Sequence, residues 1–258
     1  MFNAFRIIVL LFILVGVAST ILIQRNVSAD WQGLIDIRII PVIADSKPQT
    51  LNYVNTLSEK HFSDIQKFLV AQAKKYGINL ENGLNIKLEH SITDIPPQIP
   101  APGSSKLDII VWSLKLKWWA WTNQLDDHRV RQIRLYVLYQ SPEKNVKLGH
   151  STGLQNGLLG LVNARARRDQ STLHQLVITH ELLHIFGAHD KYKLGDGTPS
   201  YPFGYANPTK RPLFPQSKAE IMGRSIPLSE TKSEVATKLR QTVIGETTAK
   251  EIGWLSNN

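Results

Sequence analysis

The sequence predicts an α+β protein in which helices pack on a mixed β-sheet, preceded by an N-terminal transmembrane helix. Along the chain, segments with the alternating apolar pattern of strands are followed by segments with the apolar period of helices. A long apolar segment lies at the N-terminus. Residues are 42% hydrophobic and 20% charged, as in ordinary globular proteins, so a packed domain is expected rather than disorder.

The N-terminal apolar segment, residues 7–23 (IIVLLFILVGVASTILI), carries no charge and lies between Arg6 and Arg25. As a helix it would extend about 25 Å, at the short end of what crosses a bilayer. A cleavable signal peptide usually has a shorter apolar core of roughly 7 to 15 residues. We therefore expect an uncleaved membrane anchor.

Cleavage is the alternative, because the small residues of VSA before Asp30 also suit a signal-peptidase site after Ala29. Both interpretations divide the chain into residues 1–29, a membrane anchor or signal segment, and residues 30–258, one domain. Both also place that domain outside the cytoplasm, at the periplasmic side or the cell surface, or secreted if the segment is cleaved. The absence of cysteine fits an exported protein and excludes disulfides and thiolate sites.

Four segments of the domain are predicted to be strands. Alternating patterns indicate strands over 35–42 (IDIRIIPV), 84–92 (LNIKLEHSI) and 131–140 (RQIRLYVLYQ). Glycines interrupt the fourth segment, 151–166 (STGLQNGLLGLVNARA), which favours an edge strand.

Three further segments show helical patterns. Residues 51–77 form a long amphipathic pattern that ends at a glycine. Residues 106–123 contain four of the six tryptophans, and we expect a helix that packs these rings on the sheet, with a carbohydrate-stacking platform as the alternative. Residues 245–254 suit a short C-terminal helix, whereas 191–227, rich in proline and glycine, indicate a structured loop.

The remaining helix, predicted over 169–187 with Asp169 and Ser171 as capping candidates, carries the pattern HExxH. Residues four apart lie on one face of a helix, so His180 and His184 can present two imidazoles to one cation. Glu181 lies beside them. HExxH arises by chance in a chain of this composition only on the order of once in a hundred, which favours a metal site.

The net charge of +9 is distributed along the chain, and its densest cluster is Arg165, Arg167 and Arg168. Such a cluster before a helix is typical of a solvated loop, so nucleic acid is not an expected partner. A positive surface close to anionic lipid headgroups is a more plausible use of the charge.

The residues after the HExxH pattern extend it. Gly187 follows His184 by three positions and Asp190 follows Gly187 by three, giving HExxHxxGxxD, and Met222 lies downstream in EIMGR. From about residue 31 onward the chain resembles the metzincin zinc metalloproteases, most closely the snapalysin-like variant whose third ligand is aspartate.

The resemblance implies a role for each motif residue. His180, His184 and Asp190 would bind zinc, and Glu181 would act as general base, taking a proton from the metal-bound water and passing it to the leaving amine. Met222 would form an apolar floor beneath the metal, and Gly187 would turn the chain. The edge strand around Leu154–Leu161 would pair with an extended peptide substrate.

Two points of the resemblance stay open. His189 adjoins Asp190 and competes with it as third ligand, although the usual spacing favours Asp190. Many metzincins also carry a tyrosine shortly after the methionine turn, and here that role is vacant or filled from Tyr192, Tyr201 or Tyr205.

The expected function is thus that of an extracytoplasmic, membrane-anchored zinc metallopeptidase whose partners are a peptide or protein substrate and the membrane. A zinc amidohydrolase acting on cell-wall peptide is one alternative, and a non-catalytic binding module on the same fold is another. The complete set of His180, Glu181 and His184 argues against the non-catalytic module.

Overall fold

The computed structural model describes residues 31–256 except 32, 102, 124–131, 144–147 and 194. The predicted anchor or signal segment lies outside the described residues. Within the described ranges, no helix is both long enough and apolar enough to cross a bilayer.

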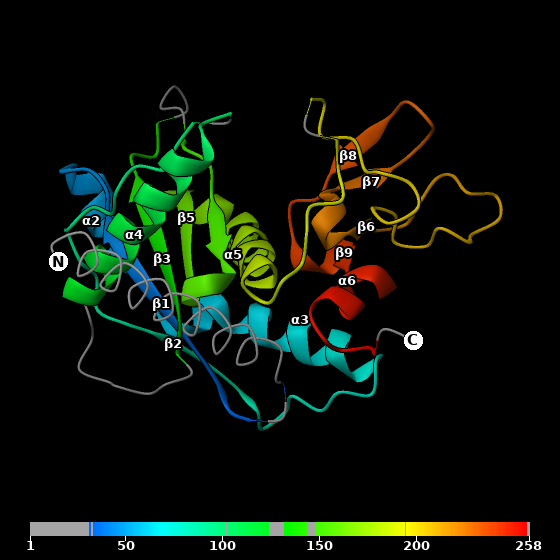
Figure 1. Ribbon diagram of the computed structural model, residues 1–258, viewed down its shortest axis with the longest axis horizontal. Helices are drawn as coiled ribbons and strands as arrows, with labels where there is room; N and C mark the ends of the chain where they lie inside the picture. The colour runs from blue at the N-terminus through cyan, green and yellow to red at the C-terminus, as the bar shows by residue number, and fades with distance from the viewer. Residues whose placement is uncertain are drawn as a thin grey trace, which may run out of the picture.

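A five-stranded sheet forms the centre of the domain (Figure 1). Its strands are β1 (Ile35–Ile43), β2 (Leu84–Leu88), β3 (Gln132–Gln140), β4 (Thr152–Leu154) and β5 (Leu159–Arg165). Their order is β2-β1-β3-β5-β4, and all neighbours are parallel except the antiparallel pair β4–β5. The predicted α+β class with a mixed sheet is therefore confirmed.

Helices cover both faces of the sheet, because side chains alternate along each strand. One face carries Leu135 and Val137 of β3 and packs against α2 (Pro48–Val54), α3 (Ser63–Lys74) and α5 (Ser171–Ile185). The other face carries Tyr136 and Leu138 and packs against α4 (Lys106–Thr122). The sheet is thus the middle of three layers.

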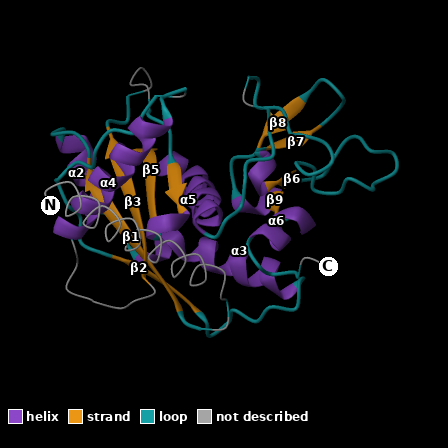
Figure 2. Cartoon of the chain, in the orientation of Figure 1, coloured by secondary structure: helices purple, strands orange, loops and turns teal. Residues whose placement is uncertain are grey.

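The C-terminal part is mostly loop (Figure 2), with short elements that pack beside α5 and α3. These elements are β6 (Ala219–Glu220), β7 (Ser225–Pro227), β8 (Ser233–Val235), β9 (Thr242–Val243) and α6 (Glu246–Glu251). Trp31 joins this part to the beginning of the domain. Its indole N–H donates to the carbonyl oxygen of Ile252 at 2.6 Å, and its ring lies 4.2 Å from that of Phe186, just after α5.

The prediction of one helix over 51–77 is wrong, since the chain forms α2 and α3 with a break between them. Proline suits the first turn of a helix, and α2 begins at Pro48. After α2, the backbone N–H of Ser58 donates to Nδ1 of His61 at 3.1 Å, which starts a new turn that leads into α3. This local capping competes with continuation of the first helix.

The prediction of one edge strand over 151–166 is also wrong. The chain reverses at a 3₁₀ turn, Gln155–Gly157, and at Leu158, whose φ is +49°. The short strand β4 is the edge, and β5 lies inside the sheet between β3 and β4. The Asn-Gly pair at the reversal is a strong turn signal. The prediction considered only that glycines interrupt the segment and did not use this pair.

The helix predicted over 106–123 is present as α4, but only some of its tryptophans pack on the sheet. Trp112 and Trp119 are buried, and the Trp119 ring lies 4.7 Å from that of Tyr136. Trp118 and Trp121 are exposed, because successive helical residues point about 100° apart. The prediction that all these rings pack on the sheet is therefore corrected.

The two predicted capping residues do not cap α5. Gln170 occupies the N-cap position without a side-chain hydrogen bond, and Ser171 is the first helical residue. The Asp169 carboxylate instead accepts a hydrogen bond from Nε of Arg167 at 2.9 Å.

Candidate active site

Helix α5 ends in a tight turn, and the segment after this turn folds back beside the last turns of the helix. Gly187 has a φ of +104°, a left-handed conformation that residues with a side chain rarely adopt. Its N–H donates to the carbonyl oxygen of His184, and the N–H of Ala188 donates to that of Leu183. This pattern is a common helix ending, and it returns Asp190 toward the two histidines.

Three side-chain atoms converge beside α5. Nε2 of His180 and Nε2 of His184 are 3.2 Å apart, and Oδ1 of Asp190 lies 3.1 Å from the first and 3.3 Å from the second. The structure therefore brings His180, His184 and Asp190 into one group, called the triad below, that could hold a metal ion.

The far nitrogens of both histidine rings bind main-chain oxygens. Nδ1 of His180 lies 3.1 Å from the carbonyl oxygen of Ile221, and Nδ1 of His184 lies 2.8 Å from that of Ala188. Because a carbonyl oxygen only accepts, each Nδ1 carries a proton and donates it. A ring that donates through Nδ1 can, in its neutral form, offer the lone pair of Nε2 to a metal ion at the point of convergence, as in metal-binding histidines.

This geometry fits zinc. Ligand atoms about 2.0–2.1 Å from one tetrahedral zinc ion are about 3.3 Å from one another, close to all three observed separations. The site also favours positive charge: burial opposes ionisation of Asp190, yet hydrogen bonds from His180 and His184 outweigh it and hold the pKa of Asp190 below its usual range. Two imidazoles and one carboxylate are a donor set that suits zinc better than calcium or magnesium.

The neighbours Asp190 and His189 point in different directions. The His189 side chain is 83% exposed, and its Nδ1 lies 3.5 Å from Glu251 of α6, away from the other two histidines. Lys191 clamps this segment, since Nζ donates to the carbonyl oxygen of His189 at 3.0 Å and pairs with Glu251 at 2.6 Å. The clamp leaves Asp190 as the residue that faces the site.

Tyr192 fixes the second oxygen of Asp190. Its hydroxyl donates to Oδ2 of Asp190 at 3.1 Å, while Oδ1 faces the histidines. Burial, together with the carboxylate of Asp190, raises the pKa of Tyr192 to about 12, so the hydroxyl keeps its proton. The guanidinium of Arg224 lies 5.7 Å from the centre of the Tyr192 ring and steadies it.

Met222 lies in a buried 3₁₀ turn, Ile221–Gly223, whose first residue supplies the carbonyl oxygen that His180 contacts. The fully buried carboxylate of Glu220 holds this turn by accepting from the N–H groups of Met222 and Gly223, at 2.6 and 3.0 Å. Its other oxygen accepts from the Thr248 hydroxyl of α6 at 2.7 Å. Glu220 thus fixes the Ile221 carbonyl that orients His180.

Glu181 is a buried carboxylate beside the triad, 6% exposed. Burial raises its pKa, although the nearby His180 and His184 act in the opposite direction. One oxygen accepts from the backbone N–H of Gly153, and the other, Oε2, has no hydrogen-bond partner among the described residues. A free buried carboxylate oxygen with a raised pKa is suited to proton transfer.

Gly153 sets the distance between the edge strand β4 and α5. A Cβ at this position would lie 2.2 Å from the carbonyl oxygen of Glu181 and 2.9 Å from Cβ of His184. Only glycine permits so close an approach. As a result, the edge strand lies directly against the turn of α5 that carries the HExxH residues.

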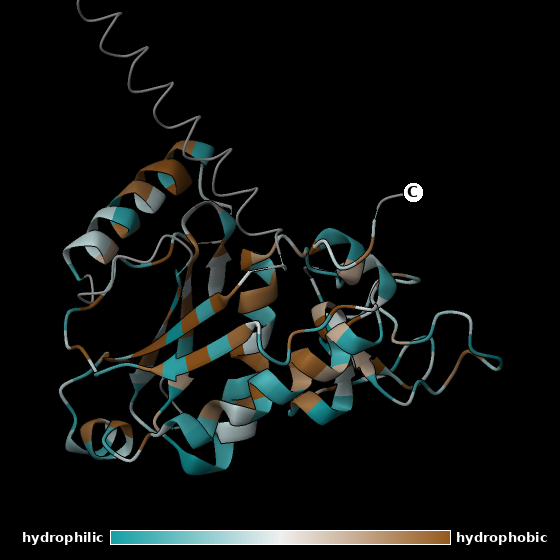
Figure 3. Cartoon of the chain, turned by 90° about the horizontal axis from the view of Figure 1, so that it is seen from below, coloured by the Kyte–Doolittle hydropathy of each residue, from teal (hydrophilic) through white to brown (hydrophobic). Residues whose placement is uncertain are grey.

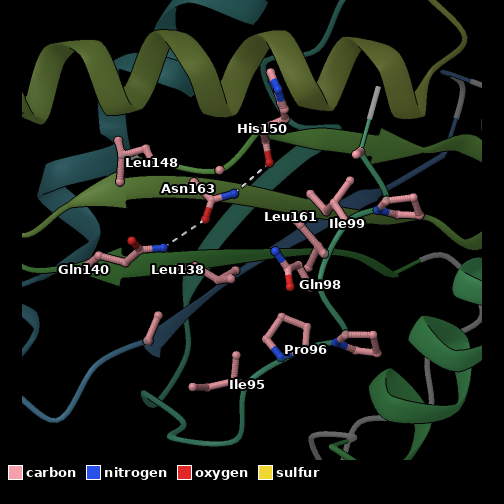
Figure 4. Close-up of a pocket in the computed structure, with 15 residues that line it drawn as sticks. Ile95, Pro96, Gln98, Ile99, Leu138, Gln140, Leu148, His150, Leu161 and Asn163 are labelled. Atoms are coloured by element: carbon pink, nitrogen blue, oxygen red, sulfur yellow. Dashed lines mark hydrogen bonds between the residues drawn. The ribbon is translucent and has the colours of Figure 1, made fainter. Parts of the chain in front are cut away.

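A hollow of about 590 Å³ lies on the α4 face of the sheet, away from the triad (Figure 4). Leu138 and Leu161 form its floor, and residues 95–101 form one wall. Two of the polar side chains drawn in Figure 4 are linked: Gln140 donates to Asn163, which donates to the carbonyl oxygen of His150 at 2.7 Å. The other lining residues are mainly apolar, and the hollow does not include the converging histidine and carboxylate side chains of the site beside α5.

Sequence reasoning assigned no role to Glu220, Arg224 or Gly153, and left Tyr192 as one of three tyrosines. A glycine inside a strand often indicates close approach of another backbone, so the role of Gly153 could have been predicted from the sequence. The contacts of Glu220 and Arg224 join segments far apart in the chain, and no local pattern reports them.

No family model and no curated protein matches the chain. A solved structure described as a chaperone–substrate complex aligns with a TM-score of 0.38 at 10% identity, over 86% of this chain and 34% of that one. A zinc-dependent peptidase from Methanocorpusculum labreanum (strain Z) aligns with a TM-score of 0.27 at 12% identity, over 63% and 85%. Scores this low carry no argument, so function is argued from the site itself.

Proposed function

We propose that the protein is a membrane-anchored, extracytoplasmic zinc metallopeptidase of the metzincin type. The observation that carries the proposal is the convergence of the ligand atoms of His180, His184 and Asp190 beside the free carboxylate oxygen of Glu181. The HExxHxxGxxD spacing and the methionine turn at Met222 support the metzincin type.

A zinc ion held by the triad would lower the pKa of a water molecule and polarise the peptide carbonyl. Glu181 supplies the proton transfers: Oε2 takes a proton from the water and gives it to the leaving amine. A carboxylate whose pKa is raised by burial suits both steps, because it binds the proton more readily than an exposed glutamate and still releases it. The N–H of Gly153 holds the other oxygen in place.

The position of β4 supports a peptide as substrate. It is the outermost strand of the described sheet, and it runs along α5 at the level of Glu181 and His184. An extended peptide that adds to a sheet edge gains main-chain hydrogen bonds whatever its sequence. Pairing with β4 would carry a peptide carbonyl past the triad.

The membrane assignment rests on the apolar segment 7–23. We expect the intact protein to stay with membranes through an alkaline carbonate wash, with its domain open to externally added protease. A soluble mature chain that begins at Asp30 would show instead that the segment is a cleaved signal.

The test of the chemistry is Glu181→Gln in the full chain, assayed on casein and a peptide library. The amide keeps the shape but accepts no proton, so turnover should fall about a hundred- to ten-thousand-fold while zinc content and folding are kept. The exposed Glu230→Gln is the matched control and should be unchanged.

Activity of Glu181→Gln within a few-fold of wild type would remove Glu181 from the mechanism. Wild-type hydrolysis of cell-wall peptide but not of casein would favour the amidohydrolase alternative. Zinc binding without turnover of either substrate would favour the non-catalytic module.

A further inference from the structure

Helix α4 carries a continuous apolar stripe that faces away from the domain. Its members are 50–72% exposed, and they recur every three or four residues: Leu107, Ile110, Val111, Leu114, Trp118 and Trp121. At about 3.6 residues per turn they fall on one side of the helix. The rings of Trp118 and Trp121 lie 5.0 Å apart at its C-terminal end.

The opposite side of α4 is already occupied by the sheet, where Trp112, Leu116 and Trp119 are buried. Figure 3 shows the helix at the outside of the domain, with apolar positions along its length. A helix with two apolar faces normally buries both, and soluble monomers rarely expose a patch of this kind.

The charges beside the stripe are mainly positive. Lys106 and Lys117 lie on one flank and Lys115 on the other, against a single carboxylate, Asp108, in the first turn. The whole chain carries a net charge of +9. A second copy of α4 would bring like charges together, whereas an anionic surface would neutralise them.

We propose that α4 lies on an anionic lipid surface, with its exposed stripe in the interface between headgroups and acyl chains. Tryptophan is enriched at that depth, and long lysine side chains reach from it to the headgroups. At 17 residues α4 is long enough to lie in the interface, and its Trp112 face remains packed on the sheet.

This second membrane contact is distinct from residues 7–23 and from the catalytic chemistry. Because α4 and α5 lie on opposite faces of the sheet, the membrane would cover the face away from the triad. The candidate active site would stay open to solvent while the domain is held at the lipid surface.

The absence of cysteine allows single-cysteine nitroxide labels to test the contact. The labels are placed at Leu114→Cys, at Leu14→Cys in the apolar segment, and at the exposed Val235→Cys of β8 as control. The full chain is reconstituted in vesicles of equal parts phosphatidylcholine and phosphatidylglycerol. Collisions with oxygen, which partitions into lipid, are compared with collisions with a water-soluble nickel chelate.

We expect oxygen collisions to exceed nickel collisions several-fold at Leu114 and nickel to dominate at Val235. The variant carrying Lys106→Glu and Lys115→Glu, or vesicles of phosphatidylcholine alone, should return the Leu114 label toward water, because each lysine near an anionic surface contributes about fivefold to binding. These lysines are exposed, so the fold should tolerate the change.

A Leu114 label that meets nickel freely in anionic vesicles would overturn the proposal. So would a label shielded from both reagents, which would indicate a second copy or residues 7–23 packed on α4. The Leu14 label keeps the two membrane claims apart: lipid at Leu14 with water at Leu114 would reject the α4 contact alone, and the reverse would reject the anchor alone.

Discussion

Asp190 and His189 are adjacent in the chain, yet only Asp190 faces the two histidines of α5. Asp190→Ala removes a ligand oxygen and should lose zinc and turnover together. His189→Ala removes an exposed ring and should keep both within a few-fold. Zinc content and peptide hydrolysis of the two variants decide the point, and the opposite ranking would move the site to three histidines.

Tyr192 is expected to position Asp190 rather than to touch the substrate. Tyr192→Phe deletes the hydrogen bond to Oδ2 of Asp190, and loss of such a supporting contact typically weakens metal binding about ten- to a hundred-fold. Competition with a zinc chelator measures the change, and the exposed Tyr201→Phe is the matched control. Equal zinc affinity in Tyr192→Phe and wild type would reject the positioning role.

Helices and strands were predictable from the sequence where local pattern and packing agree. The HExxH helix and its glycine turn are local features, so residues 169–187 were placed within a few positions. The pattern over 51–77 was continuous in apolar period, but Ser58 interrupts it through a hydrogen bond that periodicity does not detect. Pairing of β4 with β5 depends on a reversal of the chain at Asn156 and Gly157. Glycines also occur within both strands, so the glycines of the turn did not stand out in the sequence.

The approach of β4 to α5 gives a test at the level of elements. Gly153→Ala places a methyl group against the carbonyl oxygen of Glu181 and should push β4 away. Such overpacking typically costs about 1–3 kcal/mol of stability, and turnover should fall because Glu181 loses the N–H that holds it. Chemical denaturation and peptide hydrolysis measure both effects.

Gly195→Ala is the matched control, since a Cβ there meets nothing within 4 Å and Gly195 is not among the residues of positive φ. It should leave stability and turnover close to wild type. Wild-type stability and turnover in Gly153→Ala would show that β4 is free to move without affecting the site.

For the molecule as a whole, stability should depend on pH through His174. The ring packs edge-on to Tyr139, its centre 5.9 Å away, and its nitrogens have no hydrogen-bond partner among the described residues. Burial lowers the pKa of His174 from 6.5 to about 4, although the charge of Asp169 acts in the opposite direction. Between these pH values the unfolded chain binds the proton more readily than the folded one.

The stabilisation from neutral His174 is therefore present above pH 6.5 and is lost as pH falls toward 4, by up to about 3 kcal/mol. His174→Phe should flatten the dependence of unfolding free energy on pH in this window. The exposed His90→Gln should leave it unchanged. An unaltered slope in His174→Phe would show that His174 does not cause the loss.

The most direct measurement of the central claim is removal and return of the metal in the full chain. Purified protein should carry about one zinc per chain, lose peptide hydrolysis on exhaustive chelation, and regain it as about one equivalent of zinc is added back. Activity should follow bound zinc in proportion, because the triad offers one set of converging ligand atoms. Peptide hydrolysis that persists at full rate after all metal is removed would contradict the account.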